Sequence, residues 1–145
     1  MKLEHHHITS LFEQRYIDRG RAYFEEGMVE IVTSGPGNVT SRCAGTQLYK
    51  VELGLIGGQL TGNCNCPAFA DFGPCKHMAA TAFAAIAHAK ESYRPSARYV
   101  TRREEFELLE RRLRRMTKSE LIGIILQHLG DDEEMVWSIL GVDQE

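Results

Sequence analysis

The sequence predicts an α+β fold, with a small antiparallel β-meander and flanking helices followed by a helical C-terminal segment. Three observations support this. Residues 28–66 form short strand-like runs separated by turn residues. Residues 78–90 are dominated by alanine, the strongest helix former. Beyond residue 101, apolar residues recur at helical spacing.

The composition sets the scale of the molecule. The 145 residues are 43% hydrophobic and 26% charged, as expected of a soluble chain that can bury one modest core. There is no apolar run of about 18 residues, the length needed to span a bilayer, and the N-terminus lacks the hydrophobic centre of a secretory signal. We therefore expect a cytoplasmic protein with three parts: a tail at 1–9, a main module at 10–93 and a helical segment at 94–145.

The N-terminal tail contains His5, His6 and His7. A second metal site and a fragment of an expression tag are alternative interpretations of these histidines. We interpret them as a native, solvated tail without a functional role.

The first helix is predicted from Ser10 to Gly27. Ser10 and Glu13 have capping-box spacing, and Gly27 is a typical C-terminal stop. Aromatic residues recur at helical spacing and should pack on the sheet: Phe12, Tyr16, Tyr23 and Phe24. The alternative use of such a stripe is to stack nucleobases.

Four strands are predicted, at residues 28–33, 39–44, 47–56 and 60–64. In the third strand, alternate residues share one face, which we expect to point inward: Tyr49, Val51, Leu53 and Leu55. Cys43 is interpreted as a strand residue.

The fourth strand leads into a Cys-x-Cys…Cys-x-His pattern made by Cys64, Cys66, Cys75 and His77. Zinc favours thiolate and imidazole ligands and takes four of them in structural sites. Residues i and i+2 of an extended chain point to the same side, so Cys64 and Cys66 can bind one ion from a strand end. The pattern predicts a tetrahedral zinc site.

The loop between the two ligand pairs fits this interpretation. Pro67 should stop the strand, and Gly73 with Pro74 can turn the chain back. The second pair then lies where the loop meets the alanine-rich helix. Three thiolates and a neutral histidine leave the zinc site with a formal charge of minus one, which a helix N-terminus and Lys76 can offset.

Three alternatives remain for the cysteines: small buried hydrophobic residues, a disulfide, and iron–sulfur ligation, in which a histidine ligand is less usual. An enzyme is not expected, because catalytic zinc needs an open coordination position and four ligands leave none. Asp71, the carboxylate between the ligand pairs, is interpreted as a turn residue.

These ligands resemble those of the SWIM-type zinc fingers, whose pattern is C-x-C, a variable loop, then C-x-H. The resemblance covers roughly residues 19–90 and includes the segment RGRAYFEEGMVEIV, the strand LYKVEL and the flanks Cys66-Pro67 and Cys75-Lys76-His77. It identifies residues 10–93 as a SWIM-type zinc-binding module. Such modules occur beside helicase-like ATPases and in recombination-associated proteins. The resemblance implies DNA binding or protein–protein contact rather than catalysis.

A short linker is predicted near residues 93–96, followed by three helices. Thr101 with Glu104 and Thr117 with Glu120 have capping-box spacing, Gly130 is a predicted stop and Asp131 a predicted cap. Three apolar stripes follow, which predict a helical hairpin or bundle that packs on itself or on a partner: Phe106, Leu109, Leu113 and Met116; Leu121, Ile122, Ile125, Leu126 and Leu129; and Met135, Val136, Ile139 and Leu140.

Charge is segregated along the chain. Residues 94–118 carry nine basic and four acidic side chains, and residues 131–145 carry six acids and no base. Arg111, Arg114 and Arg115 lie away from the apolar stripe and, with Lys76, are candidate nucleic-acid contacts. Internal pairing of Glu107 with Arg111 and of Glu110 with Arg114 is the alternative.

Two functions follow as hypotheses. The first is a zinc module that binds nucleic acid, in particular DNA, together with a helicase-like ATPase or a recombination factor. The second is a protein–protein adaptor whose zinc is purely structural. Neither hypothesis involves a membrane or a small-molecule substrate.

Overall fold

A computed structural model describes residues 2–129 and 136. Its elements are, in chain order, α1 (His5–Leu11), α2 (Gln14–Glu25), β1 (Val29–Ser34), β2 (Asn38–Ala44), β3 (Leu48–Ile56), β4 (Gln59–Cys64), α3 (Pro67–Phe72), α4 (Lys76–His88), α5 (Ala97–Arg115) and α6 (Lys118–His128). Among the described residues, no helix combines the length and the apolar character needed to cross a membrane. The chain divides into two compact units between Phe106 and Glu107.

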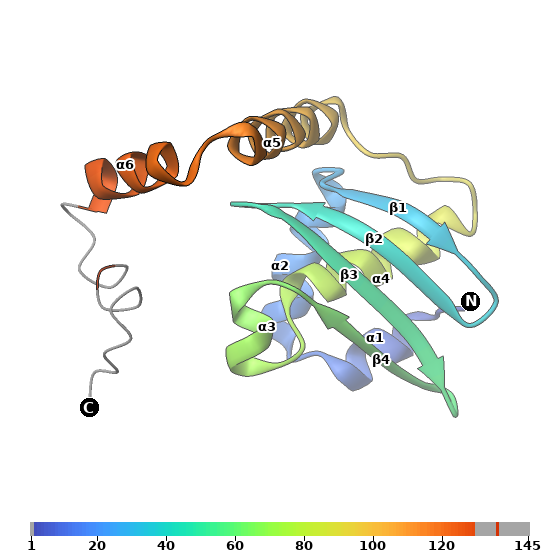
Figure 1. Ribbon diagram of the computed structural model, residues 1–145. Coiled ribbons are helices and arrows are strands. Elements are labelled where there is room, and N and C mark those ends of the chain that lie inside the picture. The colour runs from blue at the N-terminus through green and yellow to red at the C-terminus, as the bar shows by residue number, and fades with distance from the viewer. Residues whose placement is uncertain (1, 130–135, 137–145) are drawn as a thin grey trace, which may run out of the picture. The chain divides into compact units, whose positions relative to one another are not determined.

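The first unit is built on a four-stranded antiparallel sheet in the order β1-β2-β3-β4, which confirms the predicted meander. Tight turns join successive strands, and Gly57 and Gly58 both adopt positive φ between β3 and β4. Helices α2 and α4 lie together against one face of the sheet (Figure 1). The sheet and helices therefore form two layers with the core between them.

The inward face of β3 is as predicted. Tyr49, Val51 and Leu53 are buried, and Leu55 packs against the same core. Their partners on β2, Val39 and Cys43, are buried as well. Helix α4 supplies the opposite wall of the core, where its alanines permit a close approach of helix to sheet.

The predicted single helix from Ser10 to Gly27 is wrong, because the chain is extended at Phe12 and Glu13 and forms two helices instead. Phe12 is 5% exposed, so its side chain enters the core at this break. Ser10 does not cap a helix; its hydroxyl donates to the His7 carbonyl, 2.9 Å away, in the last turn of α1. Gly27, at φ +65°, follows the end of α2 as predicted.

The N-terminal histidines belong to α1 rather than to a solvated tail. His7 is 8% exposed, and its Nδ1 accepts the backbone N–H of Glu4 at 3.0 Å. Ile8 beside it is buried in the main core. Burial of this apolar side chain stabilises the segment in its folded position, although its histidine-rich composition suggests a solvated tail.

The segment expected as a linker at residues 93–96 is instead fixed to the first unit. The Tyr93 hydroxyl accepts the N–H of Val29 at 3.2 Å and donates to its carbonyl at 2.7 Å, along the free edge of β1. The Ser96 N–H donates to the Gly27 carbonyl at 2.9 Å. Residues 93–96 are held by hydrogen bonds to residues far away in the sequence. Local turn residues do not predict such bonds.

Helix α5 begins at Ala97, so Thr101 lies inside it rather than capping it. Ser96 caps instead, its Oγ accepting the N–H of Tyr99 at 3.2 Å. Tyr99 is fully buried against Met28 and Ala44, in a small second cluster. The first turns of α5 thus belong to the first unit.

The second unit contains the end of α5 and helix α6. Thr117 and Glu120 form the predicted capping box, with Glu120 accepting the N–H of Thr117 at 2.7 Å. The apolar stripes of this unit remain largely exposed, including Leu109, Ile122 and Leu126. The predicted stop at Gly130, the cap at Asp131 and nearly all of the third stripe lie outside the described residues.

Candidate metal centre

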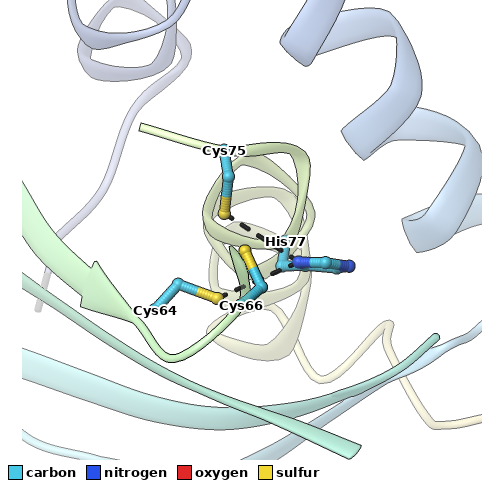
Figure 2. A group of neighbouring side chains, drawn as sticks. All are labelled: Cys64, Cys66, Cys75 and His77. Carbon is cyan, nitrogen blue, oxygen red and sulfur yellow. Dashed lines mark hydrogen bonds between the residues drawn. The ribbon is translucent and has the colours of Figure 1, made fainter. Parts of the chain in front are cut away.

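The four predicted ligands come together at one end of the sheet (Figure 2). Cys64 is the last residue of β4, and Cys66 and Cys75 are the N-cap residues of α3 and α4. His77 lies in the first turn of α4. The predicted loop between the pairs contains the short helix α3, which begins at Pro67, where the ring's fixed φ suits a first helical position.

The geometry fits a tetrahedral zinc ion. The four ligand atoms all lie within 4.8 Å of one another, and His77 Nδ1 is 3.9 Å from both Cys64 Sγ and Cys75 Sγ. Bonds of about 2.3 Å at tetrahedral angles place two sulfurs about 3.8 Å apart. The ligand atoms therefore lie close to the spacing that one tetrahedral ion requires.

All four ligand residues are buried, none more than 4% exposed. Three sulfurs and one nitrogen complete a tetrahedral shell, as in structural rather than catalytic zinc sites. Because the site is buried, water and substrates are kept from the metal position. The zinc would supply cross-linking between β4 and α4.

Packing fixes the orientation of the His77 ring. The ring lies 4.5 Å from that of Tyr49 and 5.4 Å, edge-on, from that of Tyr23, measured between centroids. Nδ1 faces the sulfurs, while Nε2 points away from them (Figure 2). Nε2 is buried and finds no hydrogen-bond acceptor in the part of the chain that the structure describes. The ring therefore presents Nδ1 as the metal ligand.

The backbone of His77 is held independently of the ring. The Thr81 hydroxyl donates to the His77 carbonyl at 2.9 Å and lies 2.6 Å from the Ser41 hydroxyl of β2. Thr81 is fully buried, so this chain of hydroxyls is part of the contact between α4 and the sheet. Sequence reasoning missed Thr81, which differs from its neighbours only as a polar residue among alanines.

The thiols differ in their acidity. Hydrogen bonds from Cys64, His77 and the Met78 backbone lower the pKa of Cys75. The hydrogen bond to Cys75 and burial raise the pKa of Cys64, and burial raises that of Cys66. Cys75 is therefore the one ligand thiol whose pKa is lowered.

Cys43 lies close to the site but outside the ligand set. Its Sγ is 3.6 Å from the His77 carbonyl, and burial raises its pKa to about 12. All four cysteines are free thiols, so the disulfide alternative does not apply. Cys43 lies in β2, which confirms the prediction of a strand residue, and the structure adds that it is fully buried in the core.

The four candidate nucleic-acid residues occupy different units. Lys76 belongs to the first unit, and its Nζ lies 4.7 Å from the centroid of the Tyr23 ring. Arg111, Arg114 and Arg115 are exposed on α5 in the second unit. Arg114 pairs with Glu110 at 2.7 Å, as the pairing alternative predicts.

Comparison with known proteins agrees with this geometry. Residues 49–86 match the family model of the SWIM zinc finger, a range that holds all four ligands. No curated protein and no solved structure matches the chain significantly. The matched range runs from Tyr49, which packs on the His77 ring, to Ile86 near the end of α4. Residues 49–86 of this chain therefore match the SWIM zinc finger, and the Cys3His arrangement of Cys64, Cys66, Cys75 and His77 within them supports zinc binding.

Proposed function

We propose that the chain is a non-catalytic module that binds nucleic acid, in particular DNA, through the end of α5. One observation carries this proposal. Arg111, Arg112, Arg114 and Arg115 are four exposed arginines within five positions. We refer to these residues as the arginine cluster.

The sequence around the arginine cluster favours contact with phosphates. No acidic residue occurs between Arg111 and Ser119. The pair between Arg114 and Glu110 joins side chains that are 76% and 62% exposed. Such a surface pair contributes about 0–1 kcal/mol, so a phosphate can replace Glu110 at little cost. The guanidinium groups therefore remain available to a polyanion.

The helix dipole offers a competing reason for the cluster. Basic residues in a last turn stabilise a helix by about 0.3–1 kcal/mol each, and Arg112, Arg114 and Arg115 lie in the last turn of α5. Four arginines are more than stabilisation of one helix terminus requires. The dipole accounts for the position of the charge, and nucleic-acid binding accounts for its amount.

The zinc finger has a supporting role in this proposal. Its four ligands leave no open position on a tetrahedral ion, so the site offers no place for a substrate. We infer a scaffold that works in the cytoplasm beside a helicase-like ATPase or a recombination factor, as the resemblance to other SWIM proteins implies.

A second candidate is a protein–protein adaptor. It is favoured by the apolar side chains that the second unit leaves exposed: Leu108, Leu109, Leu113, Ile122, Ile124, Ile125 and Leu126. An apolar surface of this kind typically meets a partner. Binding through it would depend little on salt.

The two candidates are separated by binding of the full zinc-loaded chain to a labelled DNA duplex, measured by fluorescence anisotropy from 50 to 200 mM salt. We expect affinity to fall steeply with salt. The double substitution Arg111→Glu, Arg115→Glu should weaken binding about tenfold or more and reduce the salt slope by about two.

Lys90→Glu with Arg94→Glu is the matched control, since it makes the same change in net charge at exposed positions of the first unit. Equal losses in both variants, or binding that ignores salt, would contradict DNA contact through the arginine cluster. Binding of the duplex by neither variant nor parent would leave the adaptor as the better account.

A further inference from the structure

A cleft of about 410 Å³ lies in the first unit beside the zinc finger. Its lining comes from three parts of the chain: the end of α2, the turn between β2 and β3, and the first turns of α5. The lining residues are Tyr23, Glu26, Met28, Ala44, Gly45, Thr46, Arg98 and Arg102. We propose that this cleft binds a phosphate group and, resting on the proposed function, that the group is a phosphodiester of a nucleic-acid strand.

The first argument is the placement of the two arginines. Arg98 and Arg102 stand four residues apart, so they lie on the same face of α5. Tyr99 and Arg103, one residue further on in each case, bind to β1 instead. The Tyr99 hydroxyl donates to Glu30 at 2.8 Å, and Arg103 pairs with the same carboxylate at 2.9 Å. This partly buried anchor holds the first turns of α5 against β1, so that Arg98 and Arg102 lie in the lining of the cleft.

The second argument is that the arginines are held only weakly where they are. Arg98 contacts Glu26 at 3.2 Å with side chains 74% and 55% exposed. Arg102 contacts Glu105 at 3.3 Å, also near the surface, and its guanidinium lies over the Phe106 ring. Exposed pairs of this kind contribute about 0–1 kcal/mol. A phosphate can therefore replace the two carboxylates as the partner of the guanidinium groups. The planar guanidinium group is suited to bidentate recognition of a phosphate.

The third argument concerns the remaining walls. Lys76 Nζ lies over the Tyr23 ring, so an additional positive charge stands beside a residue of the cleft. Counting Glu26 and Glu105 against Arg98, Arg102 and Lys76, these charged groups keep a net charge of plus one. Thr46 adds a hydroxyl, 2.6 Å from that of Tyr49. Met28 and Ala44 supply apolar surface against which a sugar or base can rest.

The cleft is joined to the zinc site through Tyr23. This ring packs edge-on against the His77 ring at 5.4 Å. At Gly45 an added Cβ would lie 3.1 Å from Tyr49 Cε2 and 3.4 Å from the Tyr23 hydroxyl, so glycine allows the turn to lie close to both rings. Tyr23 therefore contacts the metal ligand His77 and also lines the cleft.

The test uses amide NMR spectra of the full, zinc-loaded chain. Inorganic phosphate, a dinucleotide and a single-stranded oligonucleotide are titrated separately. We expect the amide signals of Gly45, Thr46 and Arg98 to shift with all three, at about tenfold lower concentration for the oligonucleotide than for phosphate. The double substitution Arg98→Gln, Arg102→Gln should abolish these shifts and weaken oligonucleotide binding about tenfold.

Arg94→Gln is the control, because Arg94 is exposed and outside the cleft lining. Zinc content and melting temperature establish that each variant is folded. Shifts confined to residues 111–115, with none at Gly45 or Thr46, would overturn the cleft and leave the proposed function standing. Shifts with phosphate but none with the oligonucleotide would assign the cleft to a small phosphate ligand and overturn the nucleic-acid part of this inference, while the duplex measurement would still decide the proposed function.

Discussion

The thiolates of this zinc finger are distinguished by their local surroundings. The hydrogen bond from Cys64 above all, with smaller contributions from His77 and the backbone of Met78, lowers the pKa of Cys75. Cys43 lies nearby among apolar side chains and Thr81, where burial raises its pKa to about 12. The two cysteines therefore differ in acidity, because hydrogen bonds within the ligand cluster lower the pKa of Cys75 whereas burial dominates at Cys43.

Replacing Cys75 should remove the metal, whereas replacing Cys43 should not. A hydroxyl is a poor zinc ligand compared with a thiolate, so Cys75→Ser is expected to lose bound zinc and several of the about 10–16 kcal/mol that such sites contribute to folding. Elemental analysis and urea unfolding measure the two effects. Cys43→Ala, the control, should keep one zinc per chain and lose only about 1–2 kcal/mol.

An equal loss of zinc from Cys43→Ala would show that the ligand set has been assigned wrongly. Full retention of zinc by Cys75→Ser would do the same.

Between elements, a close contact lies where α2 packs against α4. A Cβ at Gly20 would stand 2.6 Å from Ala79 Cβ and 2.9 Å from the Lys76 carbonyl oxygen. Backbone atoms cannot rotate away as a flexible side chain can. The two helices can therefore approach this closely only because position 20 is glycine, and this contact holds α2 against the helix that carries His77.

Gly20→Ala is thus expected to destabilise the chain although alanine is the better helix former. Overpacking at a contact of this kind costs about 1–3 kcal/mol, which exceeds the gain of about 1 kcal/mol in helix propensity. The control is Gly123→Ala in α6, where nothing lies within 4 Å of the added Cβ. That change should raise the helix content of α6.

Urea unfolding followed by far-ultraviolet circular dichroism measures both glycine variants. A Gly20→Ala chain as stable as the parent would mean that α2 and α4 are further apart than described.

For the whole molecule, the zinc would link the sheet to the helix that covers one of its faces. The first unit has four short strands, and alanine is the commonest residue of α4, so many of its side chains on that face are small. The binding free energy of a structural zinc adds to that of folding. The ion would join the end of β4 to the start of α4, where the described residues bring Cys64, Cys66, Cys75 and His77 together.

Removing zinc with a strong chelator should therefore unfold the first unit cooperatively. Each kcal/mol lost lowers the melting temperature of a domain of this size by about 4–8 °C. Calorimetry with and without chelator measures the shift. Added zinc should restore the transition, while magnesium should not, because it prefers oxygen ligands. An unchanged transition after complete metal removal would contradict a structural role for the zinc.

Much of this architecture was predictable from the sequence. The strands follow from alternation and turn residues, and the Cys-x-Cys…Cys-x-His spacing defines a local ligand set whose members lie within 14 positions of one another. Thr117 and Glu120 form their capping box because both partners belong to one turn. These features depend on interactions between residues that are near one another in the chain, so the pattern of residues was enough to predict them.

Other features depend on contacts between residues that are distant in the sequence. Phe12 breaks the predicted helix because the core accepts its side chain, Tyr93 pins a supposed linker to β1, and Tyr99 and Glu30 draw the start of α5 onto the sheet. Each of these contacts joins residues that are far apart in the sequence, and hydrophobic periodicity gives no information about such pairs. Their free energy arises from burial and pairing across the fold, so it exists only after the chain has folded.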